Sequence, residues 1–241
     1  MRVAGLTHTG RERSRNEDSY LVKTGKSFSI LAVADGMGGH VAGDVASALA
    51  VHVFERYWDE IYPDGLPPPH LFGEVIENLI IKANDTILEE AARDSCKEGM
   101  GSTLTAGMLS GRNLMIGHIG DSRAYLVSKS ALTLLTEDHS LVEHLVQSGR
   151  MSPEEADNHP KRHILVRALG SSADIKVDLI NVELHEGAAL LFCSDGLTSM
   201  VRDEEIHRIA LKHAHPLPAA QALIRLANER GGCDNITVVY A

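Results

Sequence analysis

Residues 30–40 read ILAVADGMGGH, a run of small and branched apolar residues that ends at Asp35 and continues into a cluster of glycines. The apolar run predicts a buried strand, and the glycines allow the positive φ values of a tight turn. A carboxylate at the end of a buried strand is unfavourable unless its charge is paired or binds a cation. The position of Asp35 therefore requires a partner from elsewhere in the chain.

Three further aspartates have the same setting. Asp121 and Asp195 directly follow the strand-like runs MIGHIG and LLFCS, and Asp234 precedes the strand-like run ITVVY. Each of them alone is typical of a turn or a helix cap. Four carboxylates at strand ends would repel one another unless cations neutralise them, so the recurrence favours a metal site.

Hard cations such as Mg²⁺ and Mn²⁺ prefer oxygen ligands and keep several waters. We expect Asp35 to bridge two such ions and Gly36 to contribute its carbonyl oxygen. Two ions roughly 3.5–4 Å apart lower the pKa of a shared water and hold the oxygens of a displacement at phosphorus. The pattern predicts a metal-dependent phosphohydrolase.

The stretch GRERSRNEDSY near the amino terminus adds a second group of charged residues. Arg13 has the planar donor geometry that grips a phosphate through two bonds. Glu17 and Asp18 can orient metal-bound waters. The alternative for this stretch, taken alone, is a solvated charged turn.

Strand-like runs come in groups separated by helical segments, which favours an α+β fold with antiparallel sheets over alternating parallel units. We expect a sheet sandwich flanked by helices. The predicted strands are 20–22, 28–34, 104–109, 114–119, 124–127, 188–193 and 236–240, with a hairpin turn at 24–27. The predicted helices are 43–60, 71–94, 139–149, 203–213 and 217–230.

Residues 137–170 differ in character from the rest of the chain. They contain two short helical patterns, a helix start at Ser152–Pro153 and a basic cluster over 161–163. We expect an insertion that packs on the main body, and a plain structural excursion is the alternative.

The net charge, the length of the apolar runs and the cysteine count exclude several classes of protein. The formal charge of -10 repels nucleic acid, and no run reaches the ~18 apolar residues of a membrane helix. Three cysteines without a CxxC pair argue against a disulfide framework or structural zinc. We expect a soluble cytoplasmic protein with Cys193 and Cys233 in the core.

Six motifs occur in the same order over nearly the whole chain: RSRNED, ADGMGGH, GSTLTA, GDSRAYL, SDGL and DNITVV. With them the chain resembles the bacterial metal-dependent Ser/Thr protein phosphatases of the PPM, or PP2C-like, family. The resemblance implies a four-layer αββα sandwich and one catalytic domain over 1–241. It also implies that 137–170 is a flap that borders the active site and influences substrate choice.

The resemblance also implies roles for the site residues, with Mn²⁺ or Mg²⁺ as the ions. Asp35 would bridge two ions, the Gly36 carbonyl would bind the first, and Asp195 and Asp234 the second. Asp121 would help to hold a third ion together with Asp195. Arg13 would bind the substrate phosphate, and Glu17 and Asp18 would act through waters. The implied mechanism is direct attack on phosphorus by the bridging hydroxide, without a phosphoenzyme.

One departure concerns the general acid. Many eukaryotic members have a His directly after the Asp-Gly pair, where this chain has Met37. His40 is the nearest substitute, and a water on a third metal ion is the alternative. In that alternative His40 is an ordinary surface residue.

Two rival functions differ from a protein phosphatase. A phosphoprotein-binding scaffold would have lost metal ligands, whereas all four aspartates and Arg13 are present. A phosphatase for small metabolites differs in substrate alone, and the basic cluster in 137–170 favours proteins. The expected partners are phosphorylated Ser/Thr proteins and a cognate Ser/Thr kinase, and the expected state is a monomer.

Overall fold

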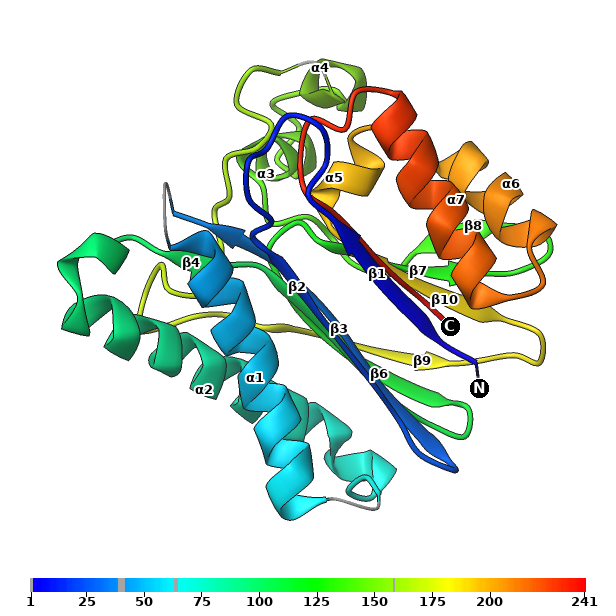
Figure 1. Cartoon of the computed structure of the whole chain (residues 1–241), viewed down its shortest axis with the longest axis horizontal. Coiled ribbons are helices and arrows are strands. Elements are labelled where there is room, and N and C mark those ends of the chain that lie inside the picture. Colours follow the sequence, from blue (N-terminus) through cyan, green and yellow to red (C-terminus); the bar gives the residue numbers. More distant parts are fainter. Residues whose placement is uncertain (1, 39–41, 63–64, 158) are drawn as a thin grey trace.

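The chain forms four layers, in which two antiparallel sheets face each other and helices cover the outer side of each (Figure 1). The computed structural model describes residues 2–38, 42–62, 65–157 and 159–241. The predicted α+β, four-layer αββα sandwich is confirmed.

One sheet has six strands and the other has five. The first has the order β2-β3-β5-β6-β9, and β4 pairs with β3 at its end; the second has the order β1-β11-β10-β7-β8. The strands of the first sheet are β2 (Asp18–Thr24), β3 (Phe28–Met37), β4 (Gly101–Ser102), β5 (Leu104–Ser110), β6 (Asn113–Ile119) and β9 (Asp178–Glu183). Those of the second are β1 (Ala4–His8), β7 (Arg123–Val127), β8 (Leu132–Leu134), β10 (Ala189–Cys193) and β11 (Ile236–Tyr240).

The outer layers are two pairs of helices. α1 (Gly43–Ile61) and α2 (Phe72–Arg93) cover the six-stranded sheet, and α6 (Asp203–Lys212) and α7 (Pro216–Glu229) cover the five-stranded one (Figure 1). Helix α2 buries Ile76, Ile80, Ala83 and Ile87 at the spacing of a single helical face, which directs it onto the sheet. The remaining short helices are η1 (Pro69–Leu71), η2 (Ser95–Lys97), α3 (Leu141–Gln147), α4 (Pro153–Asp157) and α5 (Asp195–Thr198).

The continuous apolar run of β3 follows from its place in the middle of these layers. Ile30, Ala32 and Ala34 pack in the core under α1 and α2, whereas Leu31 and Val33 pack in the core between the two sheets. Side chains alternate along a strand, so Asp35 lies on the same side of β3 as Leu31 and Val33. The chain therefore brings this carboxylate to the end of the interface between the sheets.

Several short or edge elements escaped the sequence prediction, namely β1, β4, β8, β9, η1, η2 and α5. Strand β9 lies at a sheet edge, where Leu179 is exposed and Ile180 is half-buried, so its hydrophobic pattern does not match one buried face. Helix α5 is a single short turn that begins on Asp195 itself. Such short or edge elements carry too few buried residues for a periodic signal.

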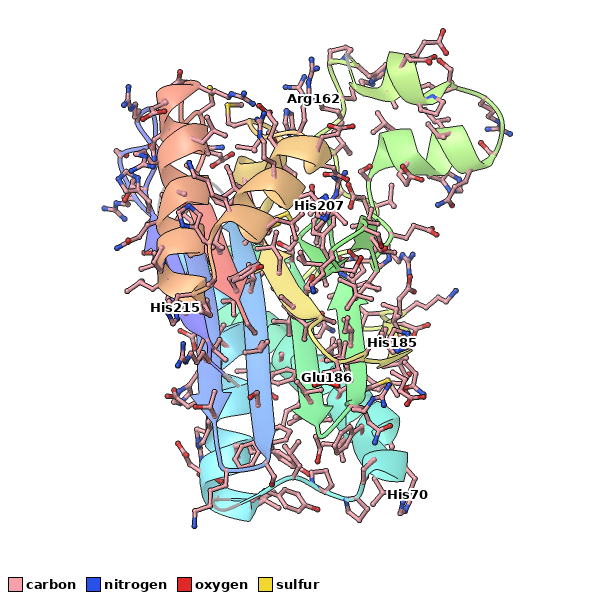
Figure 2. All side chains as sticks on the ribbon, turned by 90° about the vertical axis from the view of Figure 1, so that its right-hand side faces the viewer. His70, Arg162, His185, Glu186, His207 and His215 are labelled. Atoms are coloured by element: carbon pink, nitrogen blue, oxygen red, sulfur yellow. The ribbon has the colours of Figure 1, made fainter. Side chains whose placement is uncertain are left out.

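The segment 137–170 holds α3 and α4 and projects from one end of the sandwich (Figure 2). Helix α3 begins after Ser140, whose Oγ accepts a hydrogen bond from the backbone N–H of Glu143. At Ser152–Pro153 the predicted helix start is confirmed, since α4 begins at Pro153. In the described part of the chain, every helix is too short or too polar to cross a bilayer.

Candidate metal centre

Two strands bring Asp35 and Asp18 together. The residues are directly opposite in the antiparallel pairing of β2 and β3, so their side chains lie on the same face of the sheet. The backbone N–H of Asp35 donates to Thr103 Oγ1 over 2.9 Å, and its carbonyl accepts from the Thr103 N–H over 2.9 Å. Thr103 thereby fixes the backbone from which the Asp35 carboxylate projects.

Gly36 lies where three segments approach closely. Its N–H donates to the Glu17 carbonyl over 3.1 Å. A Cβ at this position would lie 2.0 Å from the carbonyl oxygen of Gly43, at the start of α1. Only glycine therefore allows the first turn of α1 to pack against the end of β3.

The other aspartates come from three turns at the same end of the sandwich. Asp121 follows Gly120, which has φ +111° and packs against Thr103. Asp195 is the first residue of α5, and Asp234 accepts the N–H of Asn235 just before β11.

A cleft of about 990 Å³ opens between these turns. Its lining includes seven of the residues that the sequence singled out: Arg13, Glu17, Asp35, Gly36, Asp121, Asp195 and Asp234. The predicted site residues are thus brought together from both ends of the chain and its middle. His40 lies outside the described residues, while its neighbour Met37 lines the cleft.

Asp18 is opposite Asp35 in the strand pair but does not line the cleft, and it is 8% exposed. Ser194 Oγ donates to its Oδ2 over 2.7 Å, but its buried Oδ1 has no hydrogen-bond partner among the described residues. Burial, opposed by the Ser194 and Thr237 bonds and aided by Asp195 and Asp234, raises the pKa of Asp18 to about 7. A buried oxygen without a donor fits a site that takes up a cation or its water.

The carboxylates raise one another's proton affinity. Burial, followed by the negative charges of Asp18 and Asp195, holds the pKa of Asp35 well above its usual range. Burial and the Asp195 charge do the same for the pKa of Asp121. Ionised carboxylates in this arrangement require positive charge nearby.

The donor set suits a hard divalent cation. Within the described ranges, no three His, Cys, Asp or Glu side chains are close enough to enclose an ion by themselves. Mg²⁺ and Mn²⁺ need few direct protein ligands because they retain waters, and the oxygens that line the cleft are the atoms they prefer. The residues therefore fit an open, water-rich metal centre.

Arg13 lies on the rim of the cleft. Its Nη2 donates to Asp234 Oδ2 over 2.7 Å, and its side chain is 51% exposed. Its other N–H groups have no hydrogen-bond partner among the described residues, so they can donate to an anion that enters the cleft.

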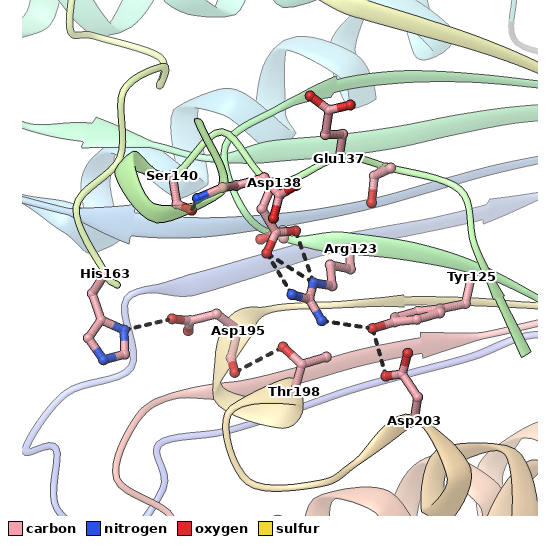
Figure 3. Close-up of polar contacts among 12 residues, drawn as sticks. Arg123, Tyr125, Glu137, Asp138, Ser140, His163, Asp195, Thr198 and Asp203 are labelled. Atoms are coloured by element: carbon pink, nitrogen blue, oxygen red, sulfur yellow. Dashed lines mark hydrogen bonds and ion pairs between the residues drawn. The ribbon is translucent and has the colours of Figure 1, made fainter. Parts of the chain in front are cut away.

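The segment 137–170 reaches the same cleft. Arg162, His163 and Leu165 line it, and His163 Nδ1 lies 3.7 Å from Asp195 Oδ2 (Figure 3). Figure 2 shows Arg162 where this segment meets the main body. Two members of the predicted basic cluster thus lie beside the acidic residues.

The cysteine prediction is half wrong. Cys193 is buried in β10, but Cys233 is exposed and lines the cleft, with Sγ 3.6 Å from Glu12 Oε1. Strand β11 begins only at Ile236, so Cys233 belongs to the loop after α7. A sequence position next to a strand-end aspartate did not imply burial.

A paired network beside the cleft escaped the sequence analysis. Arg123 Nη2 donates to Asp138 Oδ2 over 2.7 Å, and Arg123 Nε bonds both oxygens of the same carboxylate (Figure 3). Arg123 Nη1 also contacts the Tyr125 hydroxyl, which donates to Asp203. Arg123 follows Asp121 by two residues in GDSRAY, which was the available signal.

Comparisons with known proteins agree with this geometry. Residues 4–228 match the family of protein phosphatase 2C. The chain belongs to the protein phosphatase 2C family. A Listeria monocytogenes protein named serine/threonine phosphatase stp is 41% identical over 238 residues, which is 97% of this chain and 92% of the relative.

Solved structures of the protein phosphatase 2C type have the same fold. Serine/threonine phosphatase Stp1 from Staphylococcus aureus superposes with a TM-score of 0.93 at 32% identity, over 99% of this chain and 93% of that one. The catalytic domain of the phosphatase PstP, in complex with two manganese ions, has a TM-score of 0.86 at 38% identity, covering 99% and 96%. The predicted family, fold and enzyme class are confirmed.

Proposed function

We propose that the chain is a bacterial protein phosphatase that removes phosphate from phosphoserine and phosphothreonine on proteins. One observation carries the proposal: Arg13 and the acidic residues line a single cleft. The arginine can bind the phosphate group of a substrate, and the carboxylates can hold the cations that activate a water for its hydrolysis.

We propose Mn²⁺ or Mg²⁺ as the resident ions, two in the core of the site and a third beside them. Asp35 and the Gly36 carbonyl would hold the first ion. Asp35, Asp195 and Asp234 would hold the second together with waters, since these side chains alone do not enclose an ion. Asp121 and Asp195 would hold the third. When bound, the core pair would supply a bridging hydroxide at neutral pH for direct attack on phosphorus, without a phosphoenzyme.

The surrounding residues orient the reactants. Arg13 binds the phosphate from the rim of the cleft, where half of its side chain is exposed. Glu17 lines the cleft, and Asp18 has a buried oxygen without a partner in the described part of the chain, so both can accept hydrogen bonds from ordered waters.

The proton donor for the leaving serine or threonine oxygen has two candidates, His40 and a water of the third ion. An assay of His40→Ala with phosphopeptides separates them. An unchanged rate would exclude His40 as the essential acid.

We further propose that the chain is one catalytic domain over 1–241, works as a monomer in the cytoplasm and opposes a Ser/Thr kinase. The three cores share their sheets, which supports a single folding unit. Protein substrates are supported by the open cleft and by Arg162 and His163 at its edge.

The deciding experiment is a phosphate-release assay on phosphopeptides and sugar phosphates with Mn²⁺, Mg²⁺ or a chelator. We expect metal-dependent release that is faster from the peptides. Folded protein without turnover on either metal would contradict the proposal, and tight phosphopeptide binding without hydrolysis in calorimetry would favour the scaffold instead. Faster release from sugar phosphates would indicate a metabolite phosphatase.

A further inference from the structure

His139 is a buried residue at the start of segment 137–170 for which the proposed chemistry has no use. Its side chain is 0% exposed and its ring packs against that of His118, with the ring centroids 4.7 Å apart. It lies between β8 and α3 and does not line the cleft. A fully buried imidazole needs a hydrogen-bond partner for each nitrogen.

Both nitrogens of His139 have such a partner. The backbone N–H of Gly120 donates to Nδ1 over 3.1 Å, so Nδ1 is the unprotonated nitrogen. The proton then resides on Nε2, which donates to Asp178 Oδ2 over 3.0 Å. Asp178 in turn accepts from Arg167 Nη1 at its other oxygen over 2.7 Å.

Gly120 is the residue directly before Asp121. The peptide N–H of His139 also donates to the Gly120 carbonyl over 2.7 Å, so His139 holds Gly120 by two bonds. With φ +111° and a Cβ position 2.5 Å from Thr103, Gly120 admits no other residue without strain. The orientation of this glycine determines where the Asp121 side chain begins.

His139 also joins the two ends of segment 137–170, which are residues 139–141 and 164–167 and are called its roots here. Its carbonyl accepts from the N–H of Val166 over 2.8 Å, and the N–H of Leu141 donates to the Ile164 carbonyl over 2.8 Å. Arg167, one residue after Val166, adds the bond to Asp178. Both ends of the segment are therefore fixed to the turn that carries Asp121.

We propose that His139 is a positioning residue, which orients Asp121 through Gly120 and fixes both roots of segment 137–170 to that turn. Asp178, held by Arg167, keeps His139 in the tautomer that the Gly120 N–H requires. The inference rests on the proposed function for its effect on turnover but not for its geometry.

Two substitutions at His139 separate its two bonds. Asn places an amide oxygen near the position of Nδ1 and can still accept from Gly120, whereas Gln places an amide N–H near Nε2 and keeps only the bond to Asp178. His118→Gln is the matched control for the loss of a buried ring. His118 bonds the Glu137 carbonyl and Thr105 instead of Gly120.

The first measurement is hydrogen exchange at the Gly120 amide in metal-free protein. Exchange should be about tenfold faster in His139→Gln than in His139→Asn, and His118→Gln should resemble the wild type at this amide. Equal Gly120 exchange in the two His139 variants would overturn the inference.

The second measurement is a double-mutant cycle with Asp121→Asn. His139→Gln should lower kcat by about tenfold or more, as loss of an outer partner does at metal sites, and His139→Asn should recover most of it. In the Asp121→Asn background the His139→Gln effect should largely vanish, because the residue acts through Asp121. Fully multiplicative effects would overturn the inference, whereas a wild type inactive on every phosphopeptide would overturn the proposed function and leave the exchange result to decide this one.

Discussion

Two sets of partly buried carboxylates lie close together and differ in how their charge is balanced. In the cleft, burial and mutual repulsion raise the pKa of Asp35 and Asp121. Next to it, Asp138 receives three bonds from Arg123, and Asp178 receives bonds from Arg167 and His139. The paired carboxylates hold segments together, whereas the cleft carboxylates are suited to an added cation.

The largest expected effect comes from removing a cleft carboxylate. Asp35→Asn should lower metal-dependent turnover by about 1000-fold, or roughly 4 kcal/mol of transition-state stabilisation. Since the folded chain raises the pKa of Asp35, its ionised form opposes folding at pH 7, and the variant should unfold at a higher temperature without metal. Phosphopeptide assays and thermal unfolding in chelator check both. Asp234→Asn should give the same loss of turnover. Near wild-type rates in either variant would contradict the assignment of the cleft carboxylates to catalytic cations.

Removing the partner of a paired carboxylate should instead lower the free energy of unfolding. Arg123→Met leaves Asp138 without its partner and should lower the free energy of unfolding by about 3 kcal/mol. Urea unfolding at pH 7 measures it. The double variant Arg123→Met, Asp138→Leu is the control and should recover most of the loss, because it removes both charges.

Arg13 belongs to the cleft but is itself paired, with Asp234. Arg13→Ala should reduce kcat/KM for a phosphopeptide by about 30-fold, or roughly 2 kcal/mol, as expected for a charge-assisted hydrogen bond to phosphate. Arg13→Lys keeps the charge but not the two parallel hydrogen bonds of a guanidinium, so its kcat/KM should lie between those of the wild type and Arg13→Ala. An unchanged kcat/KM in Arg13→Ala would assign phosphate binding to another group.

The smallest expected effect is a loss of folding stability at low pH. Burial raises the pKa of Asp178, but the bonds from Arg167 and His139 outweigh it and leave that pKa below its usual value. The carboxylate therefore stabilises the fold above its unfolded pKa of about 3.9, and this is lost as pH falls through the folded pKa. In urea unfolding, the free energy of unfolding of the wild type should exceed that of Asp178→Asn by about 1 kcal/mol at pH 6. This difference should decrease toward pH 3. A gap independent of pH would mean that the Asp178 charge plays no part.

Local signals predicted much of the fold and most of the candidate site. The apolar run of β3 and the turn residues after it are adjacent in sequence, so the position of Asp35 could be predicted. The contact of His139 with Gly120 spans 19 residues and depends on how the roots of segment 137–170 pair. Strand β9 lacked a clear pattern because it is a sheet edge. The burial of Asp18 also depends on the tertiary structure, since its partner Ser194 lies between β10 and α5, far away in the sequence.

The pairing of β1 with β11 joins two segments that are far apart in the sequence. Ala4 of β1 pairs with Tyr240 of β11, and His8 pairs with Ile236. The loop that carries Arg13 and the turn that carries Asp234 therefore meet only when these two strands pair. Contacts between segments so far apart in sequence form slowly, so we expect the closure of β1 on β11 to be a late folding step that assembles the cleft.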